Sequence, residues 1–171
     1  GFLAIGQANT RVTPLQAAVM ANAVAMGKRV RPRIFTDEPR LAVDLPVSLA
    51  SREAVMQGLR QAVYHPQGTG KFAKVEGITL AAKTGTSQVG TPGSPRNDVW
   101  MVLLYPGYAD GVRLVIAAMA HDQTSGGRDL GRRLGHLVQR IQEWESWNED
   151  RRRQWPDGGN AASVVQLTRQ P

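Results

Sequence analysis

The sequence of 171 residues contains no cysteine and few aromatic residues. The absence of cysteine excludes disulfide bonds and zinc sites of the cysteine type. The longest apolar stretches, around residues 99–105 and 114–120, fall far short of the ~20 residues that a membrane-spanning helix needs. Aromatic residues make up 6% of the sequence, and no pattern typical of RNA stacking or of a zinc finger is present.

Positive charge exceeds negative charge, with 21 lysines and arginines against 14 acidic residues and a net charge of +7. The basic residues are scattered, with groups at 29–33, 128–133 and 151–153. Such a balance favours an anionic partner, for example a nucleic acid or a membrane surface. Because no recognition pattern joins the basic groups, we interpret them as solvated. A nucleic-acid-binding module is the last of our alternatives, and we predict no nucleic-acid partner.

An apolar run meets a polar loop at residues 81–87, which read Ala-Ala-Lys-Thr-Gly-Thr-Ser. Period-two alternation and the β-branched Thr84 and Thr86 predict a strand. Gly85 is unusual there, because a glycine within a strand indicates a bulge or the close approach of a ligand. One cation, two hydroxyls and free main-chain N–H groups suit an anionic extended peptide. A surface strand with a solvated Lys83 is the simpler alternative.

Other segments accompany this strand in a characteristic order. They are Ala4-Ile5-Gly6-Gln7, Val12-Thr13-Pro14-Leu15-Gln16, the stretch from Gly58-Leu59 to Gly68-Thr69-Gly70, and Leu80 to Gln88. Together with Lys83-Thr84-Gly85, they resemble the transpeptidase domain of penicillin-binding proteins over roughly residues 1–145. The similarity is nearest to the elongation-type class B proteins.

This resemblance implies an α+β fold in which an antiparallel sheet packs against helices. It implies that Lys83 and Thr86 are catalytic, and that the substrate is bound by Lys83, Thr84, Gly85 and Thr86. In the family, the strand that carries these residues lies at the sheet edge and faces the substrate. We expect no metal and no cofactor.

One departure concerns the nucleophile. No serine is followed three positions later by lysine, although the family uses a Ser-x-x-Lys motif. The Ser-x-Asn at 146–148 follows the Lys-Thr-Gly strand, whereas the family places it before that strand. We therefore expect residues 1–145 to be the C-terminal part of a transpeptidase domain whose nucleophile lies upstream. Residues 146–171 are expected to be a disordered tail.

The implied function is that of a peptidoglycan D,D-transpeptidase of the serine type in the intact parent, with this fragment inactive alone. Stem peptides and β-lactams are the implied ligands, and a membrane glycosyltransferase is an implied partner. The implied location is outside the inner membrane, with an N-terminal anchor that this fragment lacks. A β-lactam-hydrolysing or β-lactam-sensing domain of the same fold is the main alternative.

Local signals predict two helices before the motif strand. Thr13 and Gln16 form a capping box ahead of a helix that ends at Gly27, with Met20 and Met26 in the core. Residues 28–50 are expected to be an extended connector with at most a short strand at 33–35. A second helix is expected to begin at the cap Ser51 and to end before Pro66. Residues 68–71 are expected to form a turn.

Three strands are expected next, as an antiparallel meander formed by residues 78–87, 99–105 and 112–120. A flexible loop is expected at 90–95, and the middle strand should be buried on both faces. Gly126-Gly127 is expected to open a last helix that covers one face of the sheet. His121 and Asp122 are interpreted as loop residues, because neighbours on extended backbone point to opposite sides. His65 is interpreted as surface.

Overall fold

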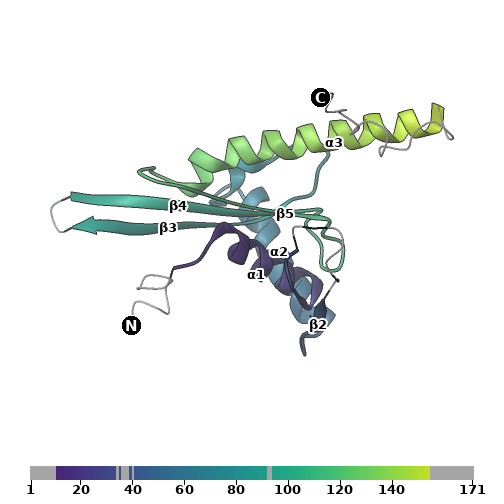
Figure 1. Cartoon of the computed structure of the whole chain (residues 1–171). Helices are drawn as coiled ribbons and strands as arrows, with labels where there is room; N and C mark the ends of the chain where they lie inside the picture. Colours follow the sequence, from purple (N-terminus) through teal and green to yellow (C-terminus); the bar gives the residue numbers. More distant parts are fainter. Residues whose placement is uncertain (1–10, 34, 36–38, 40, 92–93, 155–171) are drawn as a thin grey trace, which may run out of the picture. The chain divides into compact units, whose positions relative to one another are not determined.

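The computed structural model describes residues 11–33, 35, 39, 41–91 and 94–154. These residues form helices and two antiparallel sheets, which confirms the α+β prediction (Figure 1). The chain divides into two compact units, residues 1–136 and 137–171. The sheets and the motif strand belong to the first unit. No described helix is both long enough and apolar enough to cross a membrane.

The first helix, α1 (Pro14–Met26), has the predicted boundaries. The Thr13 hydroxyl accepts a hydrogen bond from the Gln16 N–H at 3.2 Å, and the Gln16 side chain accepts one from the Thr13 N–H at 2.8 Å. Gly27 ends the helix with a φ of 62°, a left-handed conformation that glycine adopts without strain. The capping box and the C-terminal glycine stop are therefore both confirmed.

The packing face of α1 differs in one respect from the prediction. Ala25 is buried, and Met26 is partly buried against the core. Met20, which we expected in the core, is 64% exposed. The small side chains of Ala21 and Ala25 let the helix approach its neighbours closely. The helix therefore turns these alanines, and not the larger Met20, toward the core.

Two short strands lie where we expected an extended connector. β1 (Lys28–Val30) pairs antiparallel with β2 (Ala42–Asp44), and the Arg31 N–H donates to the Leu41 carbonyl at 2.9 Å. The strand expected at 33–35 is wrong, since none of its described residues is in a strand. Neither β1 nor β2 alternates apolar and polar residues, so the pairing had no local signal.

The second helix, α2 (Leu49–Tyr64), begins earlier than we expected. Its cap is Ser48, whose hydroxyl accepts a hydrogen bond from the Ser51 N–H at 3.1 Å. Both serines suit an N-cap, and the good helix formers Leu49 and Ala50 lie between them, so the helix uses the earlier cap.

The end of α2 is as predicted, with His65 as the C-terminal cap. The apolar side chains of α2 are buried to different extents. Met56 and Val63 are fully buried, whereas Val55 is largely exposed.

The main sheet has the predicted meander topology. β3 (Ala81–Thr91), β4 (Ser94–Tyr105) and β5 (Leu114–Ala120) lie in the order β3-β4-β5 with antiparallel pairing throughout. Among the described strands, β3 is therefore at an edge, as expected.

The β3–β4 hairpin is longer than we predicted. The pairing runs from Ala81 opposite Leu104 to Thr91 opposite Ser94, so the flexible loop expected at 90–95 is wrong except for residues 92–93, which lie outside the described part. β5 pairs only with residues 99–105, and Figure 1 shows β3 and β4 continuing together beyond it. Polar residues can continue a backbone ladder, so periodicity could not reveal this extension.

The middle strand is buried unequally on its two faces. Val99, Met101 and Leu103 are fully buried, whereas Trp100 and Val102 on the opposite face are partly buried. The middle strand was predicted to be buried on both faces. The prediction is confirmed fully only for the face that carries Val99, Met101 and Leu103.

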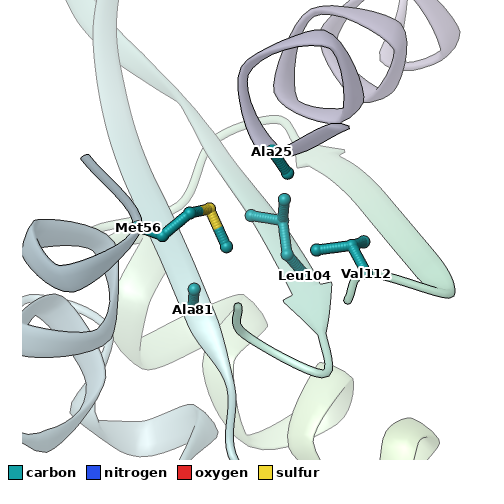
Figure 2. Close-up of a cluster of buried hydrophobic side chains, with 5 residues drawn as sticks. All are labelled: Ala25, Met56, Ala81, Leu104 and Val112. Atoms are coloured by element: carbon teal, nitrogen blue, oxygen red, sulfur yellow. The ribbon is translucent and has the colours of Figure 1, made fainter. Parts of the chain in front are cut away.

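One core cluster joins the helices to the sheet. It consists of Ala25 from α1, Met56 from α2, Ala81 from β3, Leu104 from β4 and Val112 before β5, and Figure 2 shows these side chains converging. The cluster lies at the end of the sheet where β3 begins. It holds that end rigidly against α1 and α2.

The structure also contains two short helical turns. η2 (Lys71–Ala73) contacts α2 and η3. η3 (Gly126–Leu130), a π-helical turn that precedes α3 (Gly131–Gln154), packs against the strands of the sheet. The Gly126-Gly127 pair thus opens η3 rather than the long helix itself, which corrects the prediction. That α3 covers a face of the sheet stays a prediction.

The expected disordered tail is wrong for its first part, because α3 continues to Gln154. The Arg151 guanidinium lies 4.6 Å from the ring centroid of Trp147, one helical turn away. Arginine, glutamate and glutamine are also good helix formers, so a solvated helix needs no apolar stripe here. Residues 155–171 lie outside the described part.

Candidate active site

The Lys83–Thr86 segment lies on β3, with β4 on one side of the strand. The side chains of Lys83 and Thr86 are exposed, and Thr84 and Gly85 are partly buried. Side chains alternate along a strand, so Lys83 and Gly85 share one face while Thr84 and Thr86 share the other. At a sheet edge, alternate N–H and C=O groups point away from the neighbouring strand and are available to another chain.

The Lys83 side chain bends along its own strand. Its Nζ donates a hydrogen bond to the Thr84 carbonyl oxygen at 2.6 Å. Lys83 lies on the same face as Ala81, beyond the core cluster. The ammonium group is exposed and has no carboxylate partner within salt-bridge distance among the described residues, so it is accessible to an anion.

Gly85 lies in an uninterrupted ladder opposite Trp100, so it marks no bulge. Its φ is not positive, and a Cβ placed on it would meet only the Trp100 Cβ, at 3.5 Å. That distance is ordinary van der Waals contact. Neither the backbone conformation nor internal packing therefore requires a glycine at this position.

Thr84 has a partner that sequence reasoning missed. Its hydroxyl donates to the Thr69 hydroxyl oxygen at 2.8 Å. Thr69 lies in the turn between α2 and η2, which we had predicted only as a turn. The sequence shows a threonine between two glycines. No local pattern indicates that this threonine contacts Thr84, which follows fifteen positions later.

The start of β3 is held by Tyr64 at the end of α2. The Tyr64 hydroxyl donates to the Ile78 carbonyl and accepts from the Leu80 N–H at 3.0 Å. Burial raises the pKa of this hydroxyl, although the Leu80 N–H acts in the opposite direction. The bonds fix the backbone immediately before the strand.

An ion pair and a backbone hydrogen bond connect α2 to the turn between β4 and β5. Arg52 contacts Asp110 through both carboxylate oxygens, at 2.6 and 3.0 Å, and lowers the pKa of that carboxyl. Glu53 accepts hydrogen bonds from the Ala109 N–H at 3.1 Å and from Arg60, and these lower the pKa of Glu53. The same turn contains a cis Tyr105–Pro106 peptide bond. The contacts of Arg52 and Glu53 hold the turn between β4 and β5 against α2.

The two histidines considered from the sequence lie as interpreted. His65 is exposed, and its Nδ1 accepts a hydrogen bond from the Gln67 N–H at 3.2 Å. His121 does not pair with Asp122, its neighbour in sequence. Its Nδ1 lies 2.7 Å from an Asp98 carboxylate oxygen, while Asp122 lies 3.5 Å from Arg96. Both pairs connect the end of β5 with β4.

Within the described residues, no three or more histidine or acidic side chains are placed to hold a metal ion. The chemistry of this edge is that of one accessible ammonium group, a row of hydroxyls and strand backbone. Such a set can bind an anionic extended chain. In the described part of this edge, no serine is paired with a lysine that could make it a nucleophile.

The chain is similar to known proteins over most of its length. Residues 2–143 match the family described as penicillin binding protein transpeptidase domain. The chain is 38% identical over 136 residues to penicillin-binding protein PbpB of Mycobacterium tuberculosis, covering 68% of this chain and 20% of that protein.

Solved structures are similar as well. A D,D-transpeptidase domain of a peptidoglycan glycosyltransferase from Eggerthella lenta is 25% identical with a TM-score of 0.61, over 78% of this chain and 33% of that one. Penicillin-binding protein 3 of M. tuberculosis in complex with aztreonam is 29% identical with a TM-score of 0.61, over 77% and 36%. The chain spans only a fifth to about a third of these relatives. It belongs to the penicillin-binding protein transpeptidase domain family.

Proposed function

We propose that this chain supplies the Lys-Thr-Gly side of a peptidoglycan D,D-transpeptidase site. The nucleophilic serine would come from a part of a longer protein that lies outside these 171 residues. Two observations support the proposal. The chain belongs to a transpeptidase family, and its Lys83–Thr86 segment lies at a sheet edge, with β4 on one side and no described strand on the other.

The proposed reaction is acyl transfer. The serine oxygen attacks the carbonyl of the penultimate D-Ala of a stem peptide, and the terminal D-Ala leaves with a proton on its amine. The amine of a neighbouring stem peptide then attacks the acyl-enzyme ester, which releases the serine and forms the cross-link. Lys83 would hold positive charge and protons beside the reacting groups, and its exposed ammonium group suits that role.

Thr84 and Thr86 would receive the terminal carboxylate of the substrate through their hydroxyls, which lie on one face of β3. The Thr86 N–H would supply half of an oxyanion hole. Donors of this kind are worth about 100- to 1000-fold in rate. The substrate would lie along the free edge as an added strand.

The main observation behind this proposal is the presence of a glycine at position 85. Neither its conformation nor its packing requires a glycine, yet it lies between the two threonines on the accessible edge. A substrate backbone that approaches the strand closely gives a reason for the missing side chain.

β-Lactams are the proposed inhibitors, because a similar protein has been solved with aztreonam bound. We further propose an elongation-type role, an extracytoplasmic location with an N-terminal membrane anchor, and a membrane glycosyltransferase as a partner. These three points rest on the family resemblance alone. The β-lactam-hydrolysing alternative predicts catalytic turnover of penicillin, whereas a transpeptidase should form a long-lived adduct.

Labelled penicillin tests the proposal. The longer protein should be acylated with one label per chain, and the label should remain after denaturation. The 171-residue chain alone should form no adduct, because Lys83 and the threonines cannot replace a nucleophilic serine. Stoichiometric acylation of the short chain would contradict the proposed division of the site.

A further inference from the structure

We propose that Thr69 is a positioning residue for substrate binding, acting through the hydroxyl of Thr84. The inference deepens the proposed function and rests on it. The geometry that points to it is the 2.8 Å contact between the two hydroxyls, combined with the way in which the turn bearing Thr69 is fixed.

Thr69 is flanked by two glycines, so it carries the only side chain of the turn Gly68–Gly70. The turn is tied to the end of α2, because the Gly70 N–H donates to the Ala62 carbonyl at 2.8 Å and the Gly68 N–H donates to the His65 carbonyl at 2.8 Å. The turn therefore presents one hydroxyl toward β3 from an anchored backbone.

Close packing fixes the turn on two sides. A Cβ on Gly68 would lie 2.4 Å from the Ala62 carbonyl oxygen, and a Cβ on Gly127 of η3 would lie 1.6 Å from the Thr69 carbonyl oxygen. Neither distance is possible for a real side chain. The backbone of Thr69 is thus held between α2 and η3, and both glycines are needed for that approach.

The bond contributes more to positioning than to folding. Thr69 is exposed and Thr84 is only partly buried, so both hydroxyls could bind water instead. A hydrogen bond between such groups adds little net stability. It does restrict the side chain of Thr84 to a conformation that keeps its oxygen beside Thr69.

A hydroxyl both donates and accepts, so the pair can respond to an anion. Without ligand, Thr84 donates to Thr69. When a carboxylate binds, the Thr84 hydroxyl can turn its hydrogen to the carboxylate, and Thr69 can then donate to the Thr84 oxygen. The hydroxyl groups only rotate, and no proton is transferred from one oxygen to another. The resulting chain from Thr69 through Thr84 to the carboxylate strengthens each bond within it.

The test compares a labelled penicillin with its methyl ester, which lacks the carboxylate charge. Thr69→Val in the longer protein should slow acylation by the free acid about 10-fold, because the supporting hydroxyl is lost. Acylation by the ester should change little. Thr69→Ser should restore the free-acid rate, and the control Thr79→Val, which removes a hydroxyl that accepts from Tyr108 at 3.2 Å, should leave both rates unchanged.

Two results would overturn the inference. Equal slowing of acid and ester by Thr69→Val would indicate a general structural effect, and failure of Thr69→Ser to rescue would show that the hydroxyl is not the active feature. Adding Thr69→Val to Thr84→Val should have no further effect, since Thr69 acts through Thr84. If the two effects simply add, Thr69 acts independently.

A second measurement separates this inference from the proposed function. Three-bond couplings of Thr84 in the 171-residue chain report its χ1 angle by NMR, without any acylation. One rotamer should dominate in the wild type, in Thr69→Ser and in Thr79→Val, and Thr69→Val should show averaging. Unchanged couplings in Thr69→Val would refute the positioning role. Absence of acylation in the wild-type longer protein would instead refute the proposed function.

Discussion

Gly85 and Gly127 are both close to Thr84 in the structure, but only one of them is required by the fold. A Cβ on Gly85 would make ordinary contact with Trp100, whereas a Cβ on Gly127 would overlap the Thr69 carbonyl. Gly127 is therefore required by packing, whereas we propose that Gly85 leaves room for the substrate.

Thermal melts of the 171-residue chain should reproduce the contrast. Gly85→Ala should change the unfolding free energy by less than about 0.5 kcal/mol, since the new methyl group has room. Gly127→Ala should lower it by about 1 to 3 kcal/mol, because the backbone of η3 or of the Thr69 turn has to move. Equal losses for the two variants would contradict the packing account.

The exposed Thr86 leads to a prediction on ligand choice. Thr86→Val keeps the side-chain shape and the backbone N–H but removes the hydroxyl. It should weaken ligands that carry the carboxylate by about 1.5 to 3 kcal/mol, the range for a hydrogen bond to a charged group. Acylation rates of the longer protein by a penicillin and its ester would measure this. A similar loss with both compounds would assign Thr86 a role other than carboxylate binding.

Local signals predicted the capping box of Thr13 and Gln16, because its bonds span one helical turn, and the structure confirms it. The Lys83–Thr86 segment was singled out because cation, glycine and hydroxyls are consecutive, and its role in the site stays a prediction. Thr69 was missed as a contact of Thr84, since its position depends on the way α2, η3 and β3 pack together. Met20 was misplaced for the same reason.

At the scale of elements, boundaries were predictable where a cap or a proline defines them. α1 and the end of α2 are examples. β1 and β2 were not predictable, because each has only three residues and no apolar–polar alternation. The outer half of the β3–β4 hairpin was not predictable, because its residues are mostly polar and its strands are formed by backbone pairing. The helical residues 146–154 were missed because a solvated helix has no apolar period.

The carboxylates of Glu53 and Asp110, through which α2 contacts the β4–β5 turn, predict a pH dependence of stability. The pKa values of Glu53 and Asp110 are lowered in the folded chain, so their carboxylates favour folding above their unfolded pKa values of about 4. This contribution should be lost as the pH falls below about 4 through the lowered values. Urea midpoints between about pH 7 and 3 would measure it.

Glu53→Gln and Asp110→Asn should each flatten the acid side of that profile. Asp44→Asn is a suitable control, because it removes an exposed carboxylate of β2 that lies 3.6 Å from Lys28 and does not contact the turn. If both variants keep the wild-type slope below about pH 5, the two carboxylates do not couple α2 to the turn as described.

For the molecule as a whole, the order of the strands in the sheet determines where the proposed site lies. The meander puts β3 at an edge of the described sheet, the core cluster and Tyr64 fix its beginning, and the Lys83–Thr86 segment follows directly. The fold class and this edge position were predictable from the motif order. The nucleophile could not be located, because no Ser-x-x-Lys motif occurs in the sequence.

The most direct test of the central claim is Lys83→Ala, measured in two ways. Acylation of the longer protein by labelled penicillin should be nearly abolished, because in the proposed site the ammonium group would act on the reacting atoms. The melting temperature of the 171-residue chain should stay within about 2 °C of the wild type, since an exposed lysine contributes little to stability. Lys28→Ala, at another exposed lysine, is the control and should change neither quantity. Normal acylation of Lys83→Ala, with normal melting, would contradict the claim and leave β3 as an ordinary edge strand.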